Sequence, residues 1–285
     1  MGVIIGIDVG GTTTKIVGVS LENGKIKLIQ PQFVRANDPI TAIYGAFGKF
    51  TAENGLKISD IEKIMMTGVG SSCVKGNIYG LKCEKVSEFD AIGLGGLFTS
   101  SLDSALVISM GTGTAAVHAT RGGDMKYLGG TGVGGGTIVG LSRLMLQADT
   151  ISHIEEYSVD GSLGNIDLRI KDISDEGALL QGELTASNFG NVSDMATKED
   201  MALGILNMVY ETVGMIAIFA ARSVNATDVV LTGNLTRLAY CSEKFEFFNN
   251  MKDTYGMNFI IPENSEYATV IGTALYGLNR EAVIS

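Results

Sequence analysis

The chain has 285 residues, of which 45% are hydrophobic, and a formal net charge of −10 at pH 7. That length allows two lobes of ordinary domain size, and the acidic balance argues against a nucleic-acid-binding surface. The chain shows no signal-peptide pattern and no metal-ligand spacing around Cys73, Cys83 and Cys241. We therefore expect a cytoplasmic protein with reduced thiols.

The N-terminal segment predicts a strand, a tight turn and a second strand over residues 4–17. Gly10 and Gly11 would let backbone N–H groups approach a phosphate, and the hydroxyls of Thr12 and Thr13 would add donors. The turn is therefore a candidate phosphate-binding loop.

Two charged residues flank this turn. Asp8 ends the first strand, where its carboxylate can hold Mg²⁺ through water. The alternative is a structural aspartate that caps the turn. Lys15 lies on the second strand, so it either reaches the phosphates or is a solvated strand residue.

Three further elements are predicted before residue 103. Apolar spacing indicates a helix over residues 39–54, and an apolar run indicates a strand over residues 61–67 that ends in a glycine turn. Glu88 precedes an apolar helical run at residues 91–98. Its neighbours Ser87 and Asp90 have the spacing of a helix-capping box, in which Glu88 would be only a first-turn acid.

The strand–turn–strand pattern returns at residues 105–117, with Gly111, Thr112, Gly113 and Thr114 in its turn. Two such turns facing each other would clamp a nucleotide between two related halves. We therefore expect an N-terminal lobe at residues 1–102 and a C-terminal lobe at residues 103–285. The last helix could pack back between the lobes.

A glycine-rich stretch follows, with five glycines in the seven residues 130–136. This composition predicts a loop that feeds a helix N-terminus, where free N–H groups and the helix dipole suit an anion. The alternative is a flexible surface loop. The candidate anion-binding residues are Gly132, Gly134, Gly135 and Gly136.

The segment 198–224 predicts a long helix that is apolar on nearly all sides. A buried helix is favoured over a membrane span, because Asn207 and Glu211 interrupt the segment and Arg222 follows it. A helix of this kind needs cover on several sides, which predicts a homodimer. The competing explanation is a helix sandwiched within one chain. Its apolar residues are Met201, Leu203, Ile205, Leu206, Val209, Val213, Ile216, Ile218 and Phe219.

The two hairpins resemble the phosphate loops of the actin, sugar kinase and Hsp70 superfamily. Residues 229–235 are similar to its adenosine motif, and residues 270–277 to the start of its last helix. The resemblance implies an α/β fold of two actin-like (ribonuclease H-like) lobes with the nucleotide cleft between them. It also places Gly233 and Asn234 near the adenosine.

A narrower resemblance rests on Asp8-Val9-Gly10-Gly11-Thr12, Ser87-Glu88-Phe89-Asp90-Ala91 and Leu184-Thr185-Ala186-Ser187-Asn188-Phe189-Gly190. These motifs are similar to those of the type II pantothenate kinases. The resemblance implies that ATP phosphorylates the primary hydroxyl of pantothenate, the first step of coenzyme A synthesis. It makes Glu88 the catalytic base. It also implies a dimer in which Ala186 and Ser187 lie near the partner's substrate pocket.

One position departs from the family pattern. The family has an arginine that resemblance assigns to the pantothenate carboxylate, and this chain has Tyr127 there. A tyrosine cannot form the bidentate charged pair of an arginine. Either Lys126 or Arg121 supplies the charge, or the acceptor is another small hydroxylated metabolite, such as a sugar or amino sugar.

The sequence argues against two other classes of protein. An ATP-driven activator of a radical dehydratase, from the same superfamily, resembles a dimer bridged by an iron–sulfur cluster, but no cysteine lies in residues 111–140. A non-catalytic relative would have lost Asp8 or Glu88, and both are present. A small-molecule kinase using ATP and Mg²⁺, without nucleic-acid or membrane partners, is the favoured interpretation.

Overall fold

The computed structural model describes residues 2–11, 13–35, 38–174 and 180–278. Within them, five strands form a first sheet in the order β3-β2-β1-β4-β5. β1, β2 and β3 are antiparallel, and β4 and β5 continue the sheet in parallel with β1. The strands are β1 (Val3–Val9), β2 (Thr14–Glu22), β3 (Lys25–Val34), β4 (Ile61–Thr67) and β5 (Cys83–Lys85).

A second five-stranded sheet among the described residues has the order β12-β11-β6-β7-β8. Its antiparallel strands β6, β7 and β8 correspond to β1, β2 and β3, and its parallel strands β11 and β12 to β4 and β5. The repeat of the hairpin pattern in the sequence is therefore a repeat of a whole sheet. The strands are β6 (Ser104–Met110), β7 (Thr114–Thr120), β8 (Lys126–Thr131), β11 (Asp228–Thr232) and β12 (Asn258–Ile260).

Each sheet is covered by helices on both faces. Alternate residues of a strand point to opposite faces, so neighbouring residues pack against different helices. On the first sheet, Ile5 and Ile7 pack with α1 (Pro39–Glu53), whereas Ile4 packs with α9 (Ala268–Tyr276) on the other face. On the second sheet, Val107 packs with α2 (Glu88–Ser100), and Leu106 faces the core of the long helix α6 (Lys198–Ser223).

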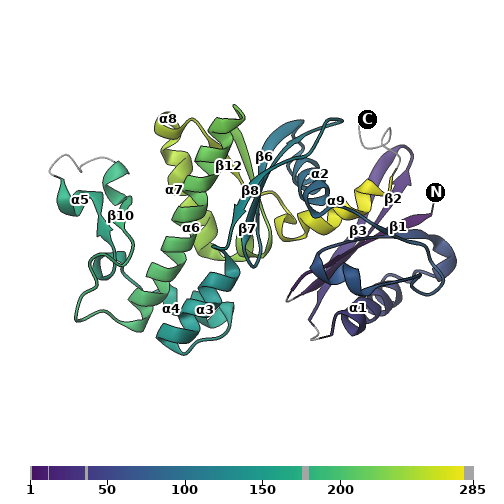
Figure 1. Ribbon diagram of the computed structural model, residues 1–285, viewed down its shortest axis with the longest axis horizontal. Coiled ribbons are helices and arrows are strands. Elements are labelled where there is room, and N and C mark those ends of the chain that lie inside the picture. The colour runs from purple at the N-terminus through teal and green to yellow at the C-terminus, as the bar shows by residue number, and fades with distance from the viewer. Residues whose placement is uncertain (1, 12, 36–37, 175–179, 279–285) are drawn as a thin grey trace.

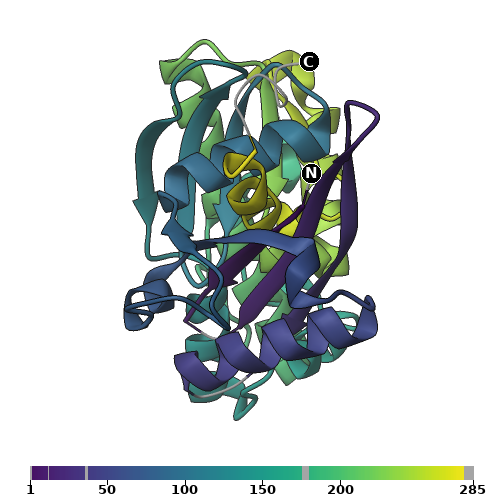
Figure 2. The same cartoon turned by 90° about the vertical axis from the view of Figure 1, so that its right-hand side faces the viewer.

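Helices α2 and α9 each pack on the sheet of the other half of the chain. α2 comes early in the chain and packs on the second sheet, while α9 comes last and packs on the first (Figure 1, Figure 2). The two helices cross at Gly95 and Gly272, where the backbone of each meets the other without a side chain between them. The division of the chain at residues 102 and 103 stays a prediction.

The predicted helix at residues 39–54 and the strand at 61–67 are confirmed. α1 begins at Pro39, and the carboxylate of Asp38 accepts a hydrogen bond from the Thr41 N–H at 2.7 Å. The capping box predicted before α2 is wrong. Ser87 is the residue before the helix, but its side chain makes no capping hydrogen bond.

The glycine-rich stretch is mostly not a loop. Gly130 belongs to β8 and pairs with Ala115, and Gly135 and Gly136 form the first turn of α3 (Gly135–Leu146). Only residues 132–134 lie between the two elements. The prediction of a loop over the whole stretch is wrong, because Gly130 pairs in the sheet and the glycines at 134–136 pack closely against residues 111–113.

The remaining elements build out the second lobe. β10 and α5 lie at the end of the molecule farthest from the first sheet (Figure 1). The bounds are α4 (Ile151–Ser158), β9 (Leu168–Arg169), α5 (Ile170–Ile173), β10 (Thr185–Ser187), α7 (Ala239–Asn250) and α8 (Lys252–Tyr255).

Among the described helices, α6 is the one long and apolar enough to cross a membrane, and 67% of its most apolar window is buried inside this protein. Val209, Val213 and Ile218 are fully buried in the core of this chain. The competing explanation of a sandwiched helix therefore accounts for most of its apolar surface. These three side chains therefore need no second subunit to cover them, and the homodimer stays a prediction.

Candidate active site

A cavity of about 670 Å³ lies between the turns of the two hairpins. It is lined from both sheets and from the first two turns of α2. Thr12 lies outside the described residues. The predicted site residues that the structure brings together here are Asp8, Gly10, Gly11, Thr13, Lys15, Glu88, Gly111, Thr112, Gly113, Thr114, Tyr127, Gly132, Gly233 and Asn234.

Other lining residues were missed by the sequence analysis. Gly68 follows β4, which runs parallel to β1 with Thr67 opposite Asp8. A Cβ on Gly68 would lie 2.6 Å from the Asp8 carboxylate, and its φ of 83° also favours glycine. A glycine after an apolar strand was the available signal. The missed residues are Gly68, Val69, Ile92, Ser109, Ala115, Gly130, Thr131 and Thr269.

Asp8 and Lys15 face each other across the first hairpin, because they are paired in the β1–β2 register. Burial raises the pKa of Asp8, and the charge of Lys15 opposes that rise. Burial lowers the pKa of Lys15, while Asp8 and Glu266 act in the opposite direction.

Lys15 is only 7% exposed, and its ammonium donates a hydrogen bond to the Glu266 carbonyl. The interpretation of a solvated strand residue is therefore wrong. A contact between Lys15 and phosphates stays a prediction.

Glu88 is the first residue of α2 and lines the same cavity as Asp8. Partial burial raises the pKa of Glu88, and the negative charge of Asp8 adds to the rise. The next residue, Phe89, stacks on Tyr127 with ring centroids 4.0 Å apart and planes at 18°. Tyr127 lines the cavity together with Glu88, whereas Phe89 is packed against the core of the second sheet.

The first N–H groups of α3 are not free for an anion. Gly135 N–H donates to the Gly111 carbonyl at 2.9 Å, and Gly136 N–H donates to the Thr112 carbonyl at 2.8 Å. Gly134 packs against the same turn, where a Cβ would lie 2.8 Å from the Thr112 carbonyl oxygen. These three glycines hold the second turn in place rather than lining the cavity, so the expectation of free N–H groups there is wrong.

The residues predicted to bind the substrate that accepts the phosphate do not lie together. Tyr127 lines the cavity, whereas its neighbour Lys126 is exposed and outside the lining. Arg121 forms an ion pair with Asp103, Nε to Oδ1 at 2.7 Å, and lines a different cavity. Ala186 and Ser187 are exposed on β10 at the far end of the second lobe (Figure 1).

The cavity fits a nucleotide with a hard cation. Among the described residues, no group of three or more His, Cys, Asp or Glu could enclose a metal ion by itself. Mg²⁺ is usually held by one or two carboxylates together with water and substrate phosphates. A single carboxylate at Asp8, between two turns rich in backbone N–H groups, matches that arrangement.

Two lobes of the same strand order, facing each other across this cavity, define an actin-like ATPase fold. Solved structures agree at 19% identity. (R)-2-hydroxyglutaryl-CoA dehydratase component A from Acidaminococcus fermentans aligns over 100% of both chains with a TM-score of 0.68. The activator of the 2-hydroxyisocaproyl-CoA dehydratase from Clostridium difficile, with bound ADPNP, aligns over 96% of this chain and 93% of that one with a TM-score of 0.67. At this identity the likeness shows the fold alone, and it confirms the predicted fold class.

Sequence comparison gives the family. The Fumble family model matches residues 99–274, and the chain belongs to the Fumble family. A type II pantothenate kinase from Staphylococcus aureus (strain USA300) is 29% identical over 95% of this chain and 98% of its own length. The predicted membership among the type II pantothenate kinases is confirmed.

Proposed function

We propose that this protein is an ATP-dependent kinase that phosphorylates the primary hydroxyl of pantothenate, the first step of coenzyme A biosynthesis. The observation that carries the proposal is the meeting of Glu88 with two glycine–threonine turns in one cavity, in a chain of the Fumble family. The rival of a sugar or amino-sugar kinase is not favoured by the family or by the similar curated proteins.

Phosphoryl transfer needs alignment, neutralisation of charge and a late proton acceptor. The turns at residues 10–13 and 111–114 would hold the phosphates from opposite sides, and Gly233 and Asn234 would border the adenosine. Asp8 would hold Mg²⁺, which supplies charge neutralisation at the phosphates when bound. Glu88 would accept the proton of the attacking hydroxyl, since the raised pKa of its carboxyl suits a base working near neutral pH.

The acceptor would bind beside the Phe89–Tyr127 stack, next to the base. Lys126 and Arg121 remain proposed as sources of the charge that the family arginine would supply. Neither lines the cavity among the described residues, and Arg121 is already paired with Asp103. Of the residues predicted to bind the substrate, Tyr127 is the one that the geometry favours most. Its side chain is 46% exposed and would contact the substrate through one hydroxyl hydrogen bond and its ring face.

The protein would act as a cytoplasmic homodimer without nucleic-acid or membrane partners. Val213 and its neighbours are covered within the chain, so the dimer contact must use the side of α6 that is less well covered. Along that side lie Met201, Met208, Thr212, Met215 and Phe219, spaced for a single helix face. Exposed Ala186 and Ser187 would then reach the substrate pocket of the partner.

The test is an assay of the purified protein with ATP, Mg²⁺ and either pantothenate, glucose or N-acetylglucosamine, with products identified by mass spectrometry. We expect phosphopantothenate alone. Tyr127→Ala should raise KM for pantothenate more than kcat changes, with Lys126→Ala as the matched comparison. Phosphorylation of a sugar without phosphopantothenate would show that the acceptor is wrong while the kinase fold and base remain.

A further inference from the structure

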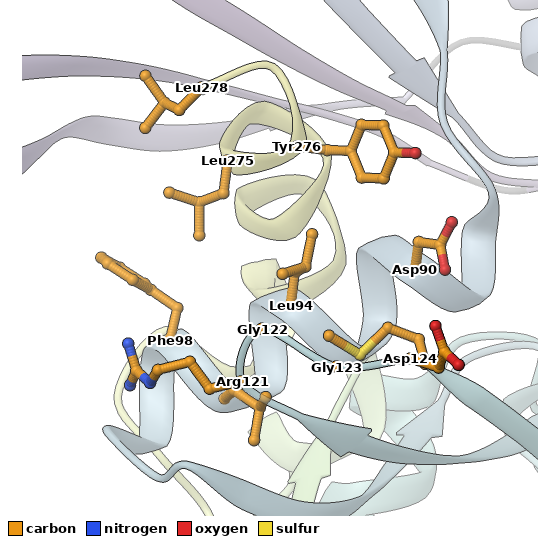
Figure 3. A pocket seen from close by; sticks show the side chains of 12 residues that line it. Asp90, Leu94, Phe98, Arg121, Gly122, Gly123, Asp124, Leu275, Tyr276 and Leu278 are labelled. Carbon is orange, nitrogen blue, oxygen red and sulfur yellow. The ribbon is translucent and has the colours of Figure 1, made fainter. Parts of the chain in front are cut away.

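A second cavity, of about 220 Å³, lies on the other side of α2 (Figure 3). Glu88 and Ile92 line the nucleotide cavity, whereas Asp90, Leu94 and Leu97 line this one. Residues two apart on a helix point to nearly opposite sides, so the two cavities are separated by the body of α2. We call the second one the hinge cavity, because it lies beside the crossing of α2 and α9.

The hinge cavity has walls from elements that belong to different lobes. Leu275 comes from α9, which is packed into the core of the first sheet. Leu97 comes from α2, and Met125 from the β7–β8 connection, which are both packed on the second sheet. A ligand here would touch both lobes at once.

The walls are apolar and one side of the cavity is acidic. In Figure 3, Asp90 and Asp124 lie on one side with the Tyr276 hydroxyl, and Arg121 lies on the opposite side. No ion pair to Asp90 or Asp124 is found among the described residues. The guanidinium of Arg121, the one lining cation among the described residues, is paired with Asp103.

A cavity with apolar walls and a few converging polar groups is the usual form of a small-molecule site. Its volume is below the ~300 Å³ at which sites for drug-sized ligands begin. Two carboxylates next to a hydrocarbon interior complement a molecule with one positive head and a short apolar body.

We propose that the hinge cavity binds a small amphipathic primary amine and that its occupancy favours the closed form of the nucleotide cavity. The two cavities lie on opposite faces of α2, and the lobes meet at the contact of Gly95 with Gly272. A rotation about this crossing that widens one cavity narrows the other. A ligand in the hinge cavity therefore resists opening of the nucleotide cavity, which is the half of the inference that rests on the proposed function.

The binding test uses the full chain and hexylammonium, with hexan-1-ol and hexanoate as matched neutral and anionic compounds, in isothermal titration calorimetry. We expect saturable binding of hexylammonium, weaker binding of hexan-1-ol and none of hexanoate. Asp124→Asn should weaken the amine about two- to fivefold, the range of an exposed ion pair. Asp149→Asn, an exposed carboxylate outside the cavity, should leave binding unchanged.

A filled cavity provides the second control. Leu94→Trp should abolish hexylammonium binding while ADP still binds. Equal affinity for hexylammonium and hexan-1-ol, no saturable binding, or full binding in Leu94→Trp would each overturn the proposed site. The charge variant Asp124→Asn keeps the test decisive if Leu94→Trp does not fold.

The coupling is measured as ADP affinity with and without hexylammonium, which needs no turnover. We expect the amine to tighten ADP roughly fivefold, at the low end of allosteric couplings, and ADP to tighten the amine equally. Unchanged ADP affinity with the amine bound would overturn the closure. Failure of ADP to bind at all would instead contradict the proposed nucleotide site and leave amine binding as a separate result.

Discussion

Gly95 of α2 and Gly272 of α9 lie against each other where the two helices cross, so that a Cβ atom on Gly272 would be 2.6 Å from the Gly95 nitrogen. The same Cβ would also collide with the Ala91 carbonyl. No flexible side chain is available to move away, because the opposing atoms belong to backbone. This contact fixes how closely the two lobes approach.

Gly272→Ala should therefore destabilise the protein by at least the ~1–3 kcal/mol typical of an overpacked core. The matched control is Gly45→Ala on α1, where a Cβ meets nothing within 4 Å. That change should stabilise the helix by roughly 0.5–1 kcal/mol through propensity alone. Urea unfolding measures both, and equal effects of the two variants would contradict the packing argument.

Glu88→Gln should lower kcat by roughly 10²–10⁴-fold, the usual contribution of general-base catalysis. The amide keeps the size of the side chain but cannot take the proton of the acceptor. Nucleotide binding should stay near normal, because the phosphate turns are unchanged. Steady-state kinetics and ADP titration separate the two effects, with the exposed Glu62→Gln as control. Full turnover in Glu88→Gln would remove Glu88 from the mechanism.

The raised pKa of Glu88 predicts the acidic side of the pH–rate profile. The base works only as the carboxylate, so a raised pKa moves the loss of activity to a higher pH. Burial is the larger cause and the charge of Asp8 the second, so kcat/KM should fall at a pH above the ordinary glutamate value of 4.5. The pKa of Asp8 is also raised, so this acidic limb of the pH–rate profile reports the joint titration of Glu88 and Asp8.

The profile is measured at saturating Mg²⁺, with circular dichroism at each pH to separate unfolding from titration. The residual activity of Glu88→Gln should lack this limb. A wild-type limb at or below pH 4.5 would show that the carboxyl is ordinary and solvated, and would argue against its place beside Asp8 in a partly buried site.

The hairpins and Glu88 could be predicted from the sequence because local patterns define them. A strand, its glycine–threonine turn and the returning strand are contiguous, so one window contains the whole motif. Gly68 and Thr269 reach the site through a parallel strand pairing and through α9, which are contacts between distant segments. Sequence patterns contain no record of such contacts.

The error at the glycine-rich stretch has a related cause. The N–H groups of Gly135 and Gly136 would suit an anion in isolation, but the carbonyls of the second turn accept their hydrogen bonds. Only the packed structure shows that these donors already have protein acceptors. The extent of the long helix α6 was likewise predicted correctly. Which segments bury its apolar side chains depends on tertiary packing, which the sequence pattern does not show.

Hydrogen bonds to a buried polar cluster should hold the segment 184–190 in its conformation. Asp167 is fully buried and accepts hydrogen bonds from Phe189 N–H at 2.8 Å and from Asn207 Nδ2 at 2.8 Å. Asp167→Ala removes the acceptor of the Phe189 N–H, at about 1–3 kcal/mol for an unpaired buried group. Asn207 Nδ2 keeps Thr185 Oγ1 as an acceptor at 3.0 Å. We expect lower stability and fast hydrogen exchange at the Phe189 amide.

The control for Asp167→Ala is Asp194→Ala, because it makes the same chemical change at an exposed aspartate. It should change stability by less than about 0.5 kcal/mol. Protection of the Phe189 amide in Asp167→Ala equal to that in the unchanged protein would contradict a positioning role for the cluster.

The proposed dimer leads to a variant on the exposed side of α6. Phe219 is 60% exposed, whereas Val213 is fully buried, so a charge at Val213 would unfold the chain rather than separate subunits. Phe219→Glu places a charge on the surface without entering the core. If two copies pair there, the carboxylate would be buried against an apolar partner and the dimer should dissociate.

Light scattering at micromolar concentration measures the result. We expect the unchanged protein to have about twice the 30.0 kDa chain mass and Phe219→Glu to have the chain mass itself. Ile58→Glu, another exposed apolar side chain on the first lobe, should remain dimeric. A chain mass for the unchanged protein would refute the dimer, and a dimeric Phe219→Glu would place the contact elsewhere. If Ala186 and Ser187 complete the partner's pocket, the monomeric variant should also show a raised KM for pantothenate while its affinity for ADP is unchanged.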